Sequence, residues 1–170
     1  MKYFQIIFFL FLFQLGFSQQ NIFDIARKGT VEELKTAMKQ NPDVINSVNE
    51  EGYSPLILSS YRGNIEVAKF LINNVKDING SSPMGTPLMA AVVKGNKEIV
   101  VALLENNANP NLTDANGTTA LIYAVQFNNK DIVKLLLNFK ADKSKIDNNG
   151  KTAFEYAVFS GNEEIINLFK

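Results

Sequence analysis

The chain has 170 residues, no histidine, no cysteine, and 17 basic against 17 acidic side chains. Without an imidazole or a thiol, histidine-based acid–base catalysis, cysteine nucleophiles and ordinary zinc sites are excluded. The balanced charge, with no run of like charge, argues against nucleic acid or an anionic membrane surface as the partner. We therefore expect the chain to hold no catalytic residue, cofactor site or metal site.

The first residues form a pattern of their own. Lys2 is followed by an apolar run at residues 3–13, broken only by Gln5. This run is too short to span a bilayer. Gly16 and Ser18 are small residues at the two positions that a signal peptidase reads, so the pattern predicts a signal peptide over residues 1–18.

Cleavage would leave residues 19–170 as one domain, exported to the periplasm or secreted, and without a membrane contact. An uncleaved N-terminal helix that tethers the domain to a membrane is the main alternative. The absence of cysteine suits either case, because a domain of this length can form its core without disulfides.

Five related segments fill the rest of the chain, and the most regular runs from Thr86 to Gly95. Thr86 is a good helix N-cap, Pro87 suits the first helical position, and Gly95 can end the helix in a left-handed conformation. A second apolar helix is expected at residues 98–104. Neither helix can bury its apolar surface alone, which predicts a stack of repeats.

Aligning the segments on the position of Gly95 gives successive spacings of 34, 32, 33 and 33 residues, at Gly29, Gly63, Gly95, Asn128 and Gly161. The corresponding repeats cover about residues 20–48, 49–80, 81–113, 114–146 and 147–170. Asn128 is the next best residue after glycine for a left-handed cap.

Turns are expected between the repeats. Asn116-Gly117 and Asn149-Gly150 are tight-turn signals, and the recurring Asp114 and Asp147 are typical of side chains that cap such turns. The linker before the third repeat is one residue short, and we expect a distorted hairpin there.

A period of about 33 residues with a Thr-Pro-Leu-x-x-Ala core resembles the ankyrin repeat. The resemblance implies an all-α solenoid of about five helix-turn-helix units, joined by β-hairpin-like loops. It departs from the family in one respect, because the histidine that usually follows Thr-Pro-Leu is absent: Ile57, Met89, Ile122 and Glu155 stand in its place.

The resemblance also implies a function. Ankyrin proteins bind protein partners with their hairpin tips and the concave face of their first helices, so we expect a monomeric, non-enzymatic module that binds, protects or inhibits another protein. The alternative is a membrane-tethered ankyrin scaffold that recruits or stabilises an envelope protein. An enzyme that uses serine, lysine or carboxylates is a third reading, which a repeat stack without an enclosed pocket disfavours.

Carried over position by position, the expected binding residues lie at the hairpin tips and at the ends of the first helices. They are Arg27, Lys28, Glu50, Glu51, Tyr53, Tyr61, Arg62, Val93, Lys94, Asn116, Thr118, Gln126, Phe127, Asn148, Lys151, Phe159 and Ser160. Exposed aromatic rings beside arginine and lysine are typical of interface anchors. The alternative for Phe127 and Phe159 is that both rings pack against adjacent repeats.

The signal peptide can be tested by N-terminal sequencing of the protein made in a bacterial host. We expect the mature chain to begin at Gln19, because the small residues end at Ser18. Recovery in a membrane pellet of a chain that still begins at Met1 would instead support the tethered scaffold.

Overall fold

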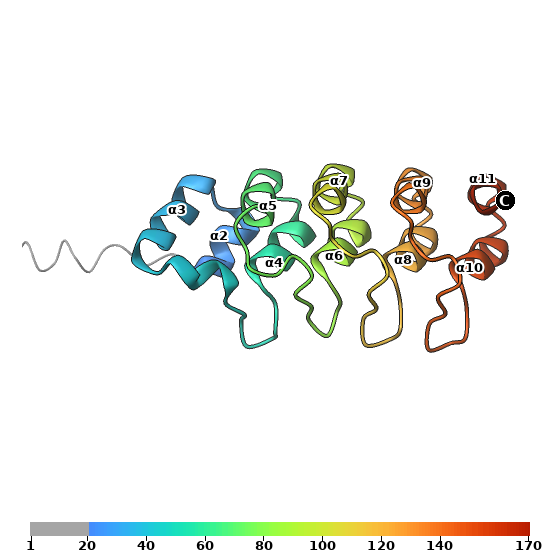
Figure 1. Ribbon diagram of the computed structural model, residues 1–170, viewed down its shortest axis with the longest axis horizontal. Coiled ribbons are helices and arrows are strands. Elements are labelled where there is room, and N and C mark those ends of the chain that lie inside the picture. The colour runs from blue at the N-terminus through green and yellow to red at the C-terminus, as the bar shows by residue number, and fades with distance from the viewer. Residues whose placement is uncertain (1–20) are drawn as a thin grey trace, which may run out of the picture.

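The computed structural model describes residues 21–170, which form a row of stacked helix pairs (Figure 1). Residues 1–18, where the signal peptide is expected, lie outside the described part. The helices are α2 (Ile22–Lys28), α3 (Val31–Gln40), η1 (Pro42–Asn46), α4 (Pro55–Arg62), α5 (Ile65–Ile72), α6 (Pro87–Val93), α7 (Lys97–Glu105), α8 (Ala120–Gln126), α9 (Lys130–Asn138), α10 (Ala153–Ser160), α11 (Glu163–Ile166) and η2 (Asn167–Phe169). The expected all-α repeat solenoid is confirmed.

Each repeat contributes a first helix and a second helix, and the loops that join successive repeats project from the same side of the stack (Figure 1). The first helices are α2, α4, α6, α8 and α10, and the second helices are α3, α5, α7, α9 and α11. Neighbouring first helices pack on one another, and so do neighbouring second helices. We call the exposed side of the first helices, together with the loops, the first-helix surface.

Helix starts follow the expected capping chemistry. The Thr86 hydroxyl accepts a hydrogen bond from the Met89 N–H at 3.3 Å, and Ser54, Thr119 and Thr152 cap their helices in the same way. The helix ends are also as expected at Gly95 and Asn128, whose φ angles are +69° and +56°. Both residues therefore provide the left-handed turn into the second helix.

Gly29 differs from these helix ends, because its backbone is extended at φ −87°. A Cβ atom at this position would lie 2.8 Å from the Cα of Ile25. Close approach of the chain, rather than a left-handed turn, is what requires glycine in the first repeat.

The core is formed between repeats, as the burial of equivalent positions shows. Val92 and Val125 hold the same place in successive first helices and are 0% and 1% exposed, whereas Val158 in the last repeat is 52% exposed. Phe154 is likewise 40% exposed, although the leucines at its position are buried. Each repeat thus buries its apolar flank only when another repeat stacks on it.

Three of the connecting loops are hairpins that are each closed by one isolated bridge. The bridges Thr113–Thr119 and Ile146–Thr152 close the hairpins of the fourth and fifth repeats. In the third repeat the Ser82–Gly85 bridge closes a much shorter loop. The distorted hairpin expected from the short linker is therefore confirmed.

Asp114 and Asp147 are buried turn caps, as expected. The Asp147 carboxylate accepts hydrogen bonds from the N–H groups of Asn149 and Lys151 and from the Tyr156 hydroxyl, the last at 2.6 Å. Burial alone would raise the pKa of Asp147, but these hydrogen bonds together hold its pKa below the usual value. The ionised carboxylate therefore stabilises the folded hairpin.

Replacing Val125 by Asp should destabilise the protein by at least about 3 kcal/mol, because it places a charge in the dry face between two repeats. Val158→Asp introduces the same side chain at the equivalent but open position of α10, and should cost less than about 0.5 kcal/mol. Urea unfolding of both variants measures the difference. Equal losses would show that the last repeat does not stack as described.

Asp147→Asn should lower the stability at pH 7 by about 1 kcal/mol, since it weakens a charge-assisted hydrogen-bond set. The lowered pKa means that the carboxylate stabilises the fold above the unfolded pKa of about 3.9, and that this contribution is lost as the pH falls through the folded value. The variant should therefore lose less stability than the parent between pH 5 and pH 2.5, as followed by thermal melts.

The matched control is Asp131→Asn, because Asp131 is exposed and is only ion-paired with Lys97 at 3.3 Å. It should change the stability by less than about 0.5 kcal/mol. A parent-like acid profile in the Asp147 variant would contradict the role given to this carboxylate.

Candidate interaction surface

Aromatic and basic side chains gather on the first-helix surface of the last two repeats. The rings of Tyr123 and Phe127 stack with centroids 6.3 Å apart along α8. The Lys151 ammonium lies 5.6 Å from the Tyr156 ring centroid and 5.4 Å from that of Phe159. We call these five residues the aromatic patch.

Two rings of the aromatic patch are strongly exposed. Phe127 is 55% and Phe159 is 85% exposed to solvent. Exposure of this extent does not fit the alternative that both phenylalanines pack against adjacent repeats. Large exposed rings of this kind are costly to leave in water and commonly mark interaction sites.

A second aromatic–cation pair lies nearer the N-terminus. Tyr61, at the end of α4, is 44% exposed, and the Lys94 ammonium from the next repeat lies 5.0 Å from its ring centroid. This contact joins two repeats across the surface, so it orders both side chains before any partner arrives.

Tyr123 and Tyr156 were not among the residues expected from the sequence. Both rings are half-buried, and their hydroxyls donate to Asp114 at 2.5 Å and to Asp147 at 2.6 Å. Burial and the Asp114 hydrogen bond raise the pKa of Tyr123 to about 12, so the hydroxyl stays protonated and keeps donating at neutral pH. The spacing of nine residues between aspartate and tyrosine, repeated in two successive units, was the available signal.

Thr118 is the expected binding residue that the structure places elsewhere. It is only 5% exposed, and its N–H donates to the Asp114 carboxylate at 2.9 Å while its carbonyl accepts from the Asp114 N–H at 3.1 Å. Its side chain therefore belongs to the interior of the hairpin and cannot meet a partner.

Three further expected residues are only half-buried. Arg27 is ion-paired with Asp24 at 3.1 Å, and the Tyr53 N–H donates to the side chain of Asn49; Val93 is the third. The remaining expected residues are exposed: Lys28, Glu50, Glu51, Tyr61, Arg62, Lys94, Asn116, Gln126, Phe127, Asn148, Lys151, Phe159 and Ser160.

Hydrogen bonds between neighbouring hairpins hold the tips in place. The Asn148 N–H donates to the Asn116 carbonyl at 2.9 Å, and the Asn148 side chain donates to the Ala115 carbonyl at 3.2 Å. These contacts join the fourth and fifth hairpins into one platform beside the aromatic patch.

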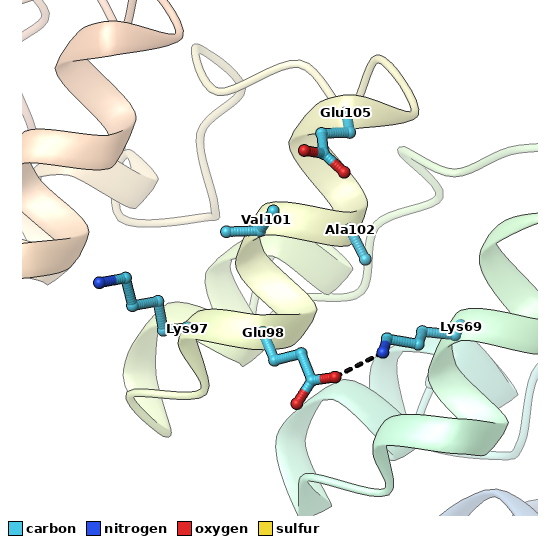
Figure 2. Close-up of a pocket in the computed structure, with 6 residues that line it drawn as sticks. All are labelled: Lys69, Lys97, Glu98, Val101, Ala102 and Glu105. Carbon is cyan, nitrogen blue, oxygen red and sulfur yellow. Dashed lines mark hydrogen bonds and ion pairs between the residues drawn. The ribbon is translucent and has the colours of Figure 1, made fainter.

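The second-helix side carries a shallow open depression of about 450 Å³ between α5 and α7. Figure 2 shows that its charged lining includes Lys69 and Glu98, which form an ion pair across it. Lys97, also in the lining, pairs with Asp131 outside it, and a depression this open is not the enclosed, largely apolar cavity typical of small-molecule sites. Within residues 21–170, no cluster of acidic side chains suited to a metal ion is present, and no helix is long and apolar enough to cross a membrane.

Comparison with known proteins gives consistent results. The family model described as ankyrin repeats, in three copies, matches residues 22–114 and 103–170. Among curated proteins, ankyrin repeat and SAM domain-containing protein 6 of Rattus norvegicus is 34% identical over 102 residues, which is 59% of this chain and 12% of that protein. Rabankyrin-5 of Homo sapiens is 29% identical over 111 residues, covering 58% of this chain and 10% of that protein.

A third relative is the probable E3 ubiquitin-protein ligase XBOS32 of Oryza sativa subsp. japonica, which is 32% identical over 107 residues, or 61% of this chain. The chain spans less than a quarter of the length of these three relatives. Ankyrin repeats are generally non-enzymatic scaffolds for protein interactions. Because the two matched spans together cover residues 22–170, the chain belongs to the ankyrin-repeat family.

Proposed function

We propose that this chain is an exported protein that binds another protein through its first-helix surface and thereby protects or inhibits that partner. The observation that carries the proposal is the aromatic patch of the last two repeats, where Phe127 and Phe159 are exposed beside Lys151. Aromatic residues near a cation are enriched at the centres of protein interfaces, where a few such side chains carry most of the binding energy.

The patch is also well ordered before binding. The hydroxyls of Tyr123 and Tyr156 donate hydrogen bonds to buried carboxylates, and the Phe127 ring stacks on the Tyr123 ring. A partner therefore loses little free energy in ordering these side chains, and more of the buried apolar area contributes to affinity.

Export is the second part of the proposal, and its support is the pattern of residues 1–18. A single lysine followed by a short apolar run and two small residues favours a cleaved signal. The absence of cysteine and histidine supports binding rather than covalent chemistry in that setting. Retention of the same segment as an anchor would give the tethered scaffold instead.

Replacing Phe127 by Ala, or Phe159 by Ala, should each weaken the binding of the partner by about 2 kcal/mol or more, which is the usual effect at interface anchors. The mature protein is immobilised, its partner is captured from the envelope fraction of the native cell, and the purified partner is titrated against each variant. The melting temperature should change little, since both rings are largely exposed.

Phe139→Ala provides the matched control. Phe139 is 37% exposed and follows the second helix α9, away from the first-helix surface. We expect its removal to leave the affinity within about 0.5 kcal/mol of the parent. Loss of affinity in this control, with affinity retained in the other two variants, would move the binding site to the second-helix side.

A further inference from the structure

In each repeat, the residue directly before the turn between the first and second helices belongs to a row along the stack. The first three members are basic, namely Lys28, Arg62 and Lys94, and all three are exposed. The next member is Phe127 of the aromatic patch, followed by the small Ser160. The row therefore changes from basic to aromatic between the third and fourth repeats. We call it the helix-end row.

Asparagines at the starts of the second helices keep this row in register. The Asn64 side chain donates to the Gly29 carbonyl at 2.9 Å, and the Asn162 side chain donates to the side chain of Asn128 at 2.5 Å. At the two middle steps, a Cβ on the turn glycine would lie 3.2 Å and 3.4 Å from the amide nitrogen of the next asparagine, at Gly63 with Asn96 and at Gly95 with Asn129. Every turn thus rests on the next repeat at the same place.

The charges of the two sides of the solenoid are treated differently. On the second-helix side, one lysine of each of three repeats pairs with a carboxylate of the next repeat: Lys69 with Glu98, Lys97 with Asp131, and Lys130 with Glu164. Within residues 21–170, no such ion pair is found for Lys28, Arg62 or Lys94. Lys94 contacts the Tyr61 ring, which attracts the cation but does not neutralise it, so the positive charge of the row is still available to the carboxylates of a partner.

The spacing of the row selects the shape of that partner. Packed helices lie about 8 to 10 Å apart, so the basic side chains recur at about that interval. A polyproline II segment advances about 3.1 Å per residue with three residues per turn, so every third side chain returns to the same face after about 9.3 Å. One turn of such a segment therefore matches one repeat of the solenoid.

We propose that the partner offers an extended acidic segment that lies along the helix-end row, with a carboxylate at every third residue and a large apolar side chain one step farther on. The carboxylates face Lys28, Arg62 and Lys94, and the apolar side chain meets Phe127. This proposal rests on the proposed function, because it names the chemistry of the partner at the same surface. Three cations at this wide spacing, in a chain without net charge, suit a peptide better than a nucleic acid.

The test uses labelled synthetic peptides and the protein without residues 1–18. The test peptide carries Glu at its positions 1, 4 and 7 and Phe at position 10, with Pro and Ser elsewhere, and it is made in both chain directions. The comparison peptide has the same composition with its Glu residues adjacent. We expect one direction of the test peptide to bind at least about tenfold tighter than the comparison peptide, and to weaken with added salt.

The protein variant K28Q/R62Q/K94Q should lose at least about tenfold in affinity for the test peptide, because it removes the complementary charge. The matched control K39Q/K134Q/K140Q removes three exposed lysines that lie on or beside the second helices, and it should bind like the parent. Thermal melts of both variants verify that each remains folded.

Each other outcome overturns a defined part of the argument. Equal binding of the two peptides would refute the periodic register, and failure of both test peptides to bind would refute the acidic segment. If an oligothymidylate of equal charge binds as tightly as the test peptide, and if K28Q/R62Q/K94Q abolishes that binding, the row would be assigned to nucleic acid. If Phe127→Ala lowers the affinity for the captured partner but K28Q/R62Q/K94Q does not, the proposed binding at the first-helix surface stands and this inference fails. If neither variant lowers that affinity, both proposals fail.

Discussion

Burial between neighbouring repeats is the constraint on which the rest of this molecule depends. The small residues Ser59, Ala91, Ala124 and Ala157 occupy one position in four successive first helices, and each is completely buried. Small side chains at this place let adjacent helices approach closely, so the helices stack at a regular interval. Because the contacts are nearest-neighbour, every exposed position recurs at a nearly constant interval, and any surface property that recurs in sequence becomes a row in space.

The two sides of the stack use that regularity for different purposes. On the second-helix side, lysines and carboxylates from successive repeats neutralise each other, as Lys97 and Asp131 do. Exposed pairs of this kind contribute little stability. On the first-helix side, Lys28, Arg62 and Lys94 form no ion pair with another of residues 21–170. The row of inter-repeat ion pairs thus lies on the second-helix side, whereas the row of Lys28, Arg62 and Lys94 lies on the first-helix surface.

Much of the architecture could be predicted from sequence because it depends on local chemistry. Thr86, Pro87 and Gly95 determine where a helix begins and ends through caps that involve only neighbouring residues. The shortened third hairpin was likewise visible as a missing residue. The position of Thr118 could not be predicted, because its burial depends on a hairpin that folds back on Asp114.

The site was predictable only in part, for a related reason. Exposure of Phe127 and Phe159 depends on what the next repeat covers, and a sequence rich in phenylalanine gives no sign of that. Gly29 shows the same limit, since its position in the repeat suggested a left-handed turn that the extended backbone does not adopt. To predict the tyrosines of the aromatic patch, one would have needed both the spacing of nine residues and the knowledge that the aspartate is buried.

The positions of the Asp–Tyr hydrogen bonds predict how the binding energy of the proposed partner would be divided along the surface. The buried Asp–Tyr hydrogen bonds occur in the fourth and fifth repeats, whereas Leu58 and Ala90 occupy the tyrosine position in the second and third. The aromatic patch therefore lies on the firmest part of the platform, where ordering costs are smallest and apolar contacts yield the most affinity. The basic part of the helix-end row needs less rigidity, because charge acts over a Debye length of about 8 to 10 Å and mainly guides the approach of a partner. Affinity would thus be concentrated at the C-terminal repeats, and orientation of the partner would come from the N-terminal ones.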